Sequence, residues 1–171
     1  MLLTRFLSMQ LRNRENFVKL LSELLAEGVI LCPLEETEKW AAIEECVQAL
    51  PHVASRKIDF ASAMAAIRER EAQEHSTILD NGVAIPHGIL PDPAPLAGAL
   101  GVSPVGVSYG VGARKAGLIF VIVGSRSVRR EYLGILAQIA RLFRGLDLKN
   151  KIMQAKLPGD VLQLIRDAEN S

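Results

Sequence analysis

His87 is the residue of this sequence that is best placed to do chemistry. It lies in the stretch STILDNGVAIPHGIL (76–90), where Pro86 precedes it and Gly88 follows it. The proline restricts the backbone just before the imidazole, and the glycine removes side-chain bulk just after it. The apolar residues 83–85 predict a β-strand that delivers His87 to this position. A proline-histidine dipeptide in a plain loop is the alternative interpretation.

The remaining histidines and the cysteines do not form a second site by their spacing. His52 and His75 lie in polar surroundings and are predicted to be solvated loop residues. Cys32 and Cys46 have no metal-ligand spacing with the histidines. We interpret both as buried thiols of a cytosolic protein and expect neither a disulfide nor a metal site.

An isolated histidine such as His87 is limited in the reactions that it can support. General base catalysis requires a partnered nucleophile, and no serine or cysteine stands close to it in the sequence. A metal site requires a second ligand two or four residues away, which is also missing. Neutral imidazole, with an ordinary pKa near 6.5, can instead attack phosphorus directly. Such a site would need an arginine and backbone N–H groups to bind the phosphoryl oxygens. A small hydrolase that uses His87 as a base is the least favoured interpretation.

The glycine-rich stretch YGVGARKAG (109–117) does not match a phosphate-binding loop. The Walker pattern requires Gly-Lys-Ser/Thr, whereas Lys115 follows Arg114 and precedes Ala116. The dinucleotide-binding fingerprint would need a glycine at position 115. The stretch Gly110 to Gly117 is therefore predicted to be a hairpin turn.

The elements that must position His87 follow from the apolar periodicity. The spacing predicts helices over 17–25, 40–50, 60–67, 133–143, 148–156 and 160–168, and strands over 29–34, 82–86, 98–108 and 117–123. The charged residues 68–71 are expected to be a solvated helix end. The unbroken apolar run 118–123 predicts a strand that is covered on both faces. Helices on both sides of a small mixed sheet satisfy this order.

The bulk composition indicates one globular domain. The chain has 171 residues, of which 49% are apolar and 23% charged. We expect an N-terminal extension over 1–16 and a single domain over 17–171. The formal net charge of +1 does not favour nucleic acid as a partner. No apolar run has the length of a membrane span, so direct membrane insertion is not expected.

The residues from Arg70 to Gly88, REAQEHSTILDNGVAIPHG, resemble the signature of the fructose/mannitol-type enzyme IIA domains of the bacterial phosphotransferase system. This family also contains stand-alone nitrogen-regulatory members. Its pattern is an Arg-Glu pair, a threonine and then Gly-x-Ala-x-Pro-His-Gly, and the similarity extends over nearly the whole chain, 17–168. The resemblance implies an α/β class protein, with a three-layer α/β/α fold and a small mixed β-sheet. It also implies a cytoplasmic location and no cofactor.

The resemblance assigns roles to individual residues. His87 corresponds to the histidine that the family phosphorylates. Thr77 and Arg70 would orient and neutralise the phosphoryl group, while Asn81 and Gly82 would shape the approach to it. The Arg-Glu pair stands one residue farther from the threonine than the family pattern has it, so Arg68 is the second choice for the phosphoryl-binding arginine.

Tyr132 is the main departure from the family pattern. Many members carry a second histidine near the start of the helix that follows the last strand, and here the matching stretch is RREYLGILAQIA (129–140). A phenol can donate a hydrogen bond to a phosphoryl oxygen but cannot act as an imidazolium cation. Arg129 or Arg130 could supply the charge instead. The alternative is that Tyr132 only packs on the sheet.

The resemblance implies a phosphotransferase function as a histidine phosphocarrier. His87 would accept a phosphoryl group from a phosphorylated histidine-containing phosphocarrier protein and pass it to an enzyme IIB or a regulatory target protein. No transporter span or second carrier domain is found in this chain, which favours the nitrogen-regulation branch over sugar transport. The alternative is a catalytically impaired enzyme IIA-like protein that acts as an interaction module. Tyr132 and the irregular Arg-Glu spacing favour that alternative.

Overall fold

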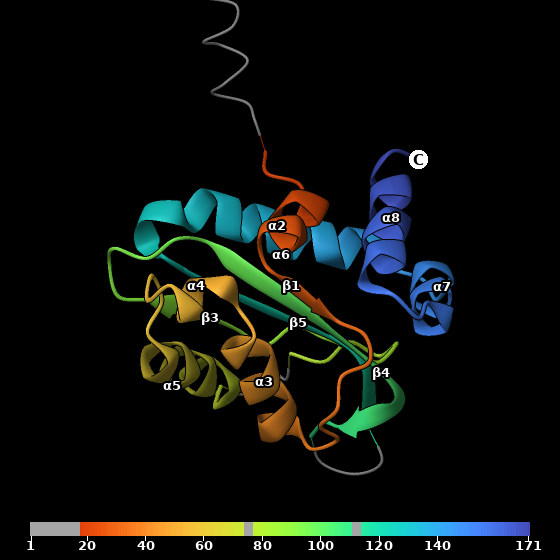
Figure 1. Ribbon diagram of the computed structural model, residues 1–171, viewed down its shortest axis with the longest axis horizontal. Coiled ribbons are helices and arrows are strands. Elements are labelled where there is room, and N and C mark those ends of the chain that lie inside the picture. Colours follow the sequence, from red (N-terminus) through yellow and green to blue (C-terminus); the bar gives the residue numbers. More distant parts are fainter. Residues whose placement is uncertain (1–17, 74–76, 111–113) are drawn as a thin grey trace, which may run out of the picture.

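A mixed sheet of five strands lies between two layers of helices (Figure 1). The structure is a computed structural model, which describes residues 18–73, 77–110 and 114–171. The strands are β1 (Val29–Leu31), β2 (Val83–Ala84), β3 (His87–Leu90), β4 (Ala97–Ser108) and β5 (Lys115–Ser125). The helices are α2 (Leu21–Glu27), α3 (Lys39–Gln48), α4 (Pro51–Ala54), α5 (Phe60–Glu71), α6 (Arg129–Leu142), α7 (Asp147–Gln154) and α8 (Pro158–Glu169), with the short 3-10 helix η1 (Arg126–Val128) before α6. The predicted α/β class, with helices on both sides of a small mixed sheet, is confirmed.

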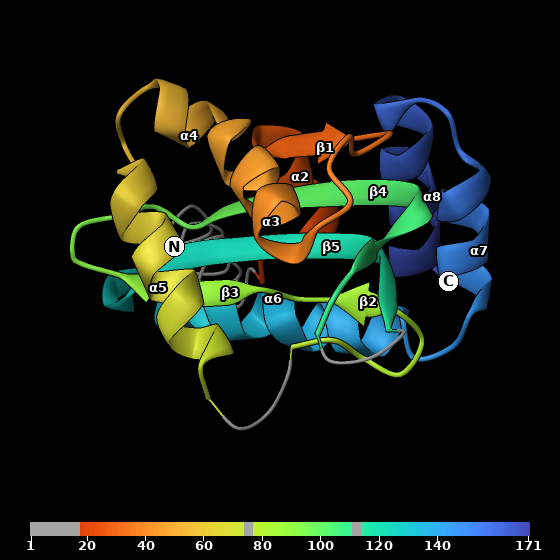
Figure 2. The same ribbon diagram turned by 90° about the horizontal axis from the view of Figure 1, so that it is seen from below.

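The strand order is β1-β4-β5-β2, and β3 also pairs with β5 (Figure 2). β4 and β5 are antiparallel, whereas the other pairings are parallel. Val83 pairs with Leu118 and His87 with Ile122, so both pairs have the same offset along β5. β2 and β3 therefore continue one line of strand that is interrupted at residues 85–86. The predicted strand over 82–86 is corrected accordingly, because His87 begins a strand instead of following one.

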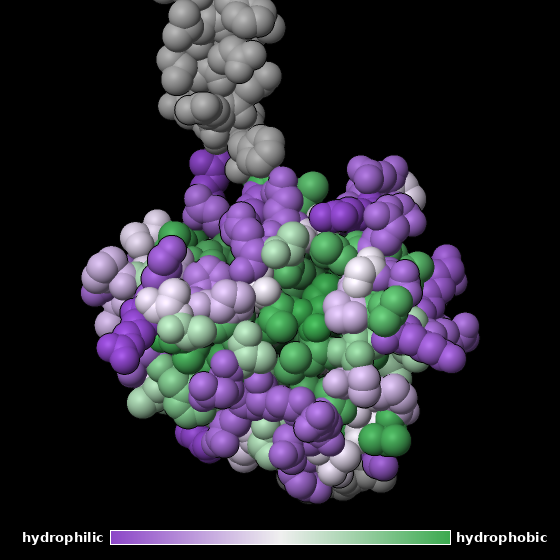
Figure 3. All heavy atoms as spheres, in the orientation of Figure 1, coloured by the Kyte–Doolittle hydropathy of each residue, from purple (hydrophilic) through white to green (hydrophobic). Residues whose placement is uncertain are grey.

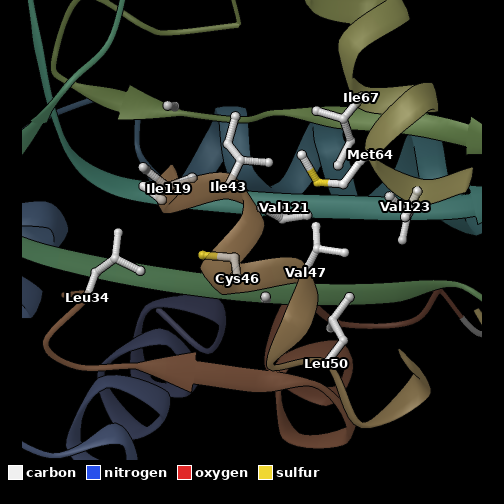
Figure 4. Packing of buried hydrophobic residues seen from close by; sticks show 14 of the residues in the cluster. Leu34, Ile43, Cys46, Val47, Leu50, Met64, Ile67, Ile119, Val121 and Val123 are labelled. Atoms are coloured by element: carbon white, nitrogen blue, oxygen red, sulfur yellow. The ribbon is translucent and has the colours of Figure 1, made fainter. Parts of the chain in front are cut away.

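β5 separates the two halves of the core. Ile119, Val121 and Val123 pack with residues of α3 and α5 (Figure 4). The alternate side chains, Leu118, Phe120 and Ile122, pack with α2, α6, α7 and α8. Successive side chains of a strand point to opposite faces, so an unbroken apolar run requires a sheet that is covered on both sides. The prediction for residues 118–123 is confirmed.

Several local predictions are refined by the structure. Pro51 opens the short helix α4, because its fixed φ and missing N–H suit the first helical position. His52 lies in that helix and is half-buried, so it is not the solvated loop residue that was predicted. Cys46 is buried and Cys32 is half-buried. Ser108 pairs with Lys115, so β4 and β5 form a hairpin as predicted, but Lys115 to Gly117 already belong to β5 and not to the turn. Residues 111–113 lie outside the described part. The predicted extension over 1–16 and His75 also lie outside the described residues.

The apolar surface on one face follows the edge of the sheet. Figure 3 shows hydrophobic surface near the middle of that face, where Figure 1 places β1. β1 is an edge strand, and its three residues are half-buried. Among the described helices, none has the length and apolar character needed to cross a bilayer.

Gly88 is required by the close approach of α5 to β3. A Cβ added at Gly88 would lie 2.7 Å from the carbonyl carbon of Ala66 and 2.8 Å from its Cβ. Because part of this contact is backbone, the neighbour cannot turn aside. We expect Gly88→Ala to lower the free energy of unfolding by about 2 kcal/mol, measured by urea denaturation. Gly145→Ala is the matched control, since a Cβ there would meet no described atom within 4 Å. Equal stabilities of the two variants would contradict this account.

Candidate functional site

The backbone beside His87 determines which ring nitrogen can react. His87 Nδ1 lies 2.5 Å from the backbone carbonyl oxygen of Ile85. A carbonyl oxygen only accepts hydrogen bonds, so Nδ1 must carry the proton. In the neutral imidazole the lone pair is then on Nε2. Nε2 is therefore the nitrogen of His87 that can bond to an electrophile.

A cavity of about 260 Å³ opens beside His87 between α5, β3 and α6. Its polar groups include Arg70 from the end of α5, His87 from β3 and Tyr132 from α6. Ile89 and Leu133, which also line it, are exposed apolar side chains. The cavity thus combines an imidazole, a cation and a phenol with an apolar border.

The structure distinguishes between the two candidate arginines. Arg70 lines the cavity together with His87. Arg68 pairs instead with Glu44, at 3.2 Å, and its guanidinium carbon lies 4.3 Å from the centre of the Trp40 ring. Residues two apart on a helix face in nearly opposite directions, so only one of the two can reach the cavity. Arg70 is the arginine that the structure brings to His87.

Tyr132 lies beside His87 and is buried. The two ring centroids are 6.1 Å apart, and the rings are tilted by 57°. Burial raises the pKa of Tyr132 to about 12, although the positive charge of Arg70 acts in the opposite direction. The phenol therefore keeps its proton at neutral pH and can donate a hydrogen bond. Arg129 and Arg130 are exposed and do not line this cavity.

Burial keeps His87 in its neutral form. The pKa of His87 is lowered, chiefly by burial, while its hydrogen bond to the Ile85 carbonyl acts in the opposite direction. The charge of Arg70 lowers this pKa further, and the charge of Glu71 raises it. At pH 7 the imidazole is unprotonated on Nε2, as nucleophilic attack requires.

The structure places the hydroxyl of Thr77 outside this cavity. Thr77 Oγ1 donates to Glu71 Oε1 and lies 2.9 Å from the hydroxyl of Tyr109, and the residue is buried. The side chain of Asn81 also lies away from the cavity beside His87, since its amide donates to the carbonyl of Phe143 at 2.5 Å. Gly82, at φ 77°, forms a tight turn next to it. Asn81 and Gly82 thus shape the turn that precedes β2 and not the approach to His87.

The burial of Glu71 differs more from the expectation drawn from the sequence than that of any other residue discussed in this region. It was expected to be solvated within the charged run 68–71, but its side chain is only 2% exposed. Lys39, at the start of α3, donates to its carboxylate at 2.6 Å. The only sequence signal is that Glu71 stands next to Arg70, about 100° around the helix, so that one side chain faces the cavity and the other the core.

Comparison with known proteins shows the family of this chain. The family model described as "Phosphoenolpyruvate-dependent sugar phosphotransferase system, EIIA 2" matches residues 23–168. The chain belongs to this family. It is an enzyme IIA phosphoryl-transfer domain, and the resemblance stated from the sequence is confirmed.

The relatives are larger proteins, and the solved structures share the fold. The chain is 32% identical over 130 residues to the multiphosphoryl transfer protein of Vibrio cholerae, covering 75% of this chain and 32% of that protein. It is 28% identical over 146 residues to the fructose-specific EIIABC component of Bacillus subtilis, covering 85% and 23% respectively. The chain thus spans a third or less of the length of these relatives. The nitrogen regulatory protein IIA-Ntr of Neisseria meningitidis matches with a TM-score of 0.71 at 24% identity, covering 84% of this chain and 97% of that one. The mannitol IIA of Escherichia coli matches at 0.66 and 19%, covering 82% and 96%.

Proposed function

We propose that His87 carries the phosphoryl group of this enzyme IIA domain, with Nε2 as the acceptor atom. The observation that carries the proposal is the contact between Nδ1 and the Ile85 carbonyl, which leaves the lone pair on Nε2. Arg70 binds the phosphoryl oxygens, since its planar guanidinium can donate two parallel hydrogen bonds to them. Tyr132 donates a further hydrogen bond.

The transfer needs no base and no cofactor. The Nε2 lone pair attacks the phosphorus of a phosphohistidine on the donor protein. The P–N bond of the donor breaks, and its electron pair returns to the donor imidazole. A new P–N bond forms at Nε2, while Nδ1 keeps its proton and its hydrogen bond to Ile85. The positive charge that develops on the ring of His87 is stabilised by that carbonyl.

The partners follow from the same chemistry. We propose that the donor is a phosphorylated histidine-containing phosphocarrier protein, and that the next acceptor is an enzyme IIB. There is a solved complex of the mannitol enzyme IIA with phosphorylated enzyme IIB, both of Escherichia coli. Its matching chain shares the fold of this chain, with a TM-score of 0.66 at 18% identity. The exposed Ile89 and Leu133 at the cavity offer apolar surface for such partners.

The output of the phosphorylated domain has two candidates. A regulatory output on a target protein was the expectation from the sequence, and phosphorylation would act by adding about −1.5 to −2 charges beside the cavity. Sugar uptake is the second candidate, which is favoured by the similarity to the fructose-specific relative at 28% identity. To distinguish a regulatory output from sugar uptake, the binding of the phosphorylated and of the unphosphorylated protein to an enzyme IIB from a fructose-specific system is measured.

Intact-mass spectrometry tests the proposal. The protein is incubated with phosphoenolpyruvate, enzyme I and the histidine phosphocarrier, and we expect an acid-labile gain of about 80 Da, the mass of one phosphoryl group. An active enzyme IIA of the same family serves as the control acceptor. If folded protein gains no mass while the control does, the domain is an interaction module and not a carrier.

Tyr132→Phe tests the role of the phenol. The variant keeps the ring that packs beside His87 and removes only the hydroxyl. We expect the rate of phosphoryl acceptance to fall about tenfold, because a hydrogen bond to a charged group is lost. Rapid-quench measurements of the transfer rate provide the check. An unchanged rate would show that Tyr132 only packs on the sheet.

The pH dependence follows from the lowered pKa of His87. A lowered pKa in the folded protein means that the neutral, nucleophilic form persists below pH 6.5, the ordinary value for histidine. We expect the ring resonances of His87 to titrate below pH 6.5 in NMR spectra. The contribution to stability is complete above pH 6.5 and is lost as the pH falls through the folded pKa. A midpoint at or above 6.5 would contradict the assigned burial.

A further inference from the structure

Four segments of the chain meet at the carboxylate of Glu71, which belongs to α5. Lys39 donates to Oε2 at 2.6 Å from the start of α3. The hydroxyl of Thr77 donates to Oε1 from the segment that leads to β2. Tyr109, directly after β4, places its hydroxyl 3.2 Å from Oε1 and 2.9 Å from Thr77 Oγ1. The carboxylate is thus surrounded by donors.

The surroundings of Glu71 hold these donors in place. Tyr109 is fully buried, and burial together with the nearby carboxylate raises the pKa of its phenol. The phenol therefore remains a donor. The ammonium of Lys39 also lies 4.6 Å from the centre of the Tyr109 ring, which adds a cation–π contact. A buried carboxylate is stable only when it is paired and hydrogen-bonded, as it is here.

A short series of hydrogen bonds connects this cluster to the imidazole of His87. The backbone carbonyl of Thr77 accepts from the N–H of Ile85 at 2.9 Å. The carbonyl of the same Ile85 accepts from Nδ1 of His87 at 2.5 Å. Thr77 therefore holds the N–H of the residue whose carbonyl, in the next peptide unit, fixes the tautomer of His87, although the side chain of Thr77 lies outside the cavity.

At the interruption between β2 and β3, the N–H of Ile85 is held by Thr77 and not by the sheet. Residues 85–86 lie between two paired stretches, and Pro86 has no N–H to donate. On the other side of Ile85, the N–H of Ile122 in β5 donates to the carbonyl of Pro86 at 3.1 Å, so the Ile85 carbonyl lies between two anchored points of the backbone.

We propose that Glu71 and Thr77 are positioning residues for phosphoryl transfer, acting through Ile85 on the tautomer of His87. The inference rests on the proposed role of His87 as the acceptor. It replaces the direct contact between Thr77 and the phosphoryl group that the sequence had led us to expect. It also gives the Arg-Glu pair two separate tasks, with Arg70 in the cavity and Glu71 beneath it.

The test compares Thr77→Val with Thr77→Ser. Valine has nearly the shape of threonine but lacks the hydroxyl, whereas serine keeps the hydroxyl. For each folded variant, nitrogen-15 NMR of labelled histidine reports which ring nitrogen of His87 carries the proton. The initial rate of phosphorylation by the phosphorylated histidine phosphocarrier is measured in parallel. Glu71→Gln, which keeps an acceptor for the hydroxyl but loses the charge, is a further variant.

We expect Nδ1–H in the wild type, a mixture of tautomers in Thr77→Val and a rate that is lower by about tenfold or more. Thr77→Ser should retain the wild-type tautomer and a rate within about twofold of it. Glu44→Gln is the matched control, because its partner Arg68 also joins α3 to α5, but in an exposed pair. The control should change neither readout.

The two readouts separate the possible failures. If folded Thr77→Val keeps the wild-type tautomer and rate, the inference is overturned. It is also overturned if Thr77→Ser loses as much as Thr77→Val, because the hydroxyl would then not be the cause. If the tautomer depends on Thr77 but the wild type accepts no phosphoryl group, the positioning stands and the proposed function fails.

Discussion

His87→Asn should abolish phosphoryl acceptance completely. The asparagine amide can still donate a hydrogen bond from near the position of Nδ1 to the Ile85 carbonyl, so the local backbone is retained. The variant has no nitrogen lone pair that can attack phosphorus, because an amide nitrogen is not nucleophilic. Intact-mass spectrometry after incubation with the phosphorylated carrier should therefore detect no acid-labile gain.

The control for this variant is its stability. The thermal midpoint of His87→Asn should remain within a few degrees of the wild type, which corresponds to less than about 1 kcal/mol for a domain of this size. His52→Asn serves as a second control, since His52 lies in α4 and does not line the cavity. A phosphoryl group that still appeared on His87→Asn would move the acceptor to another residue.

Loss of the Arg70 guanidinium should have the second largest effect. Arg70 is the arginine that lines the cavity with His87, and a transferring phosphoryl group carries its negative charge on its oxygens. We expect Arg70→Ala to reduce the rate of acceptance by roughly 100-fold or more, as removal of a donor to a transferring phosphoryl group usually does. Arg70→Lys keeps the charge but not the planar fork, so an intermediate loss of about tenfold is expected. Single-turnover transfer rates measure both.

Arg68→Ala provides the comparison. Its guanidinium is paired with Glu44 and stacked on Trp40, outside the cavity. This exposed pair contributes less than about 1 kcal/mol to stability, and the transfer rate should change by no more than about twofold. If Arg68→Ala were the slower of the two alanine variants, the assignment of Arg70 would be wrong.

The order of elements and the place of the candidate histidine beside a strand could be predicted from the sequence to a large extent, because they depend on local properties. The apolar run of β5 shows burial on two faces directly, and the residues around His87 form a contiguous motif. The family pattern also led to Arg70 as the first choice. These features depend on neighbours in the chain and on the periodicity of helices and strands.

The positions of the side chains of Thr77, Glu71 and Arg68 could not be predicted, because they depend on partners that are distant in the sequence. Glu71 is buried only because Lys39 and Tyr109 approach it from other elements. Arg68 is drawn away from the cavity by Trp40 and Glu44, which belong to α3. The break between β2 and β3 arises because the N–H of Ile85 donates to the distant carbonyl of Thr77 and Pro86 has no N–H.

The most direct test of the central claim is nitrogen-15 and phosphorus-31 NMR of the phosphorylated wild-type protein, labelled on histidine. We predict one phosphorus resonance that is coupled to Nε2 of His87, while Nδ1 retains its proton and its hydrogen bond to the Ile85 carbonyl. Coupling to Nδ1, or phosphorylation of any other residue, would contradict the account of how this backbone prepares His87 for transfer.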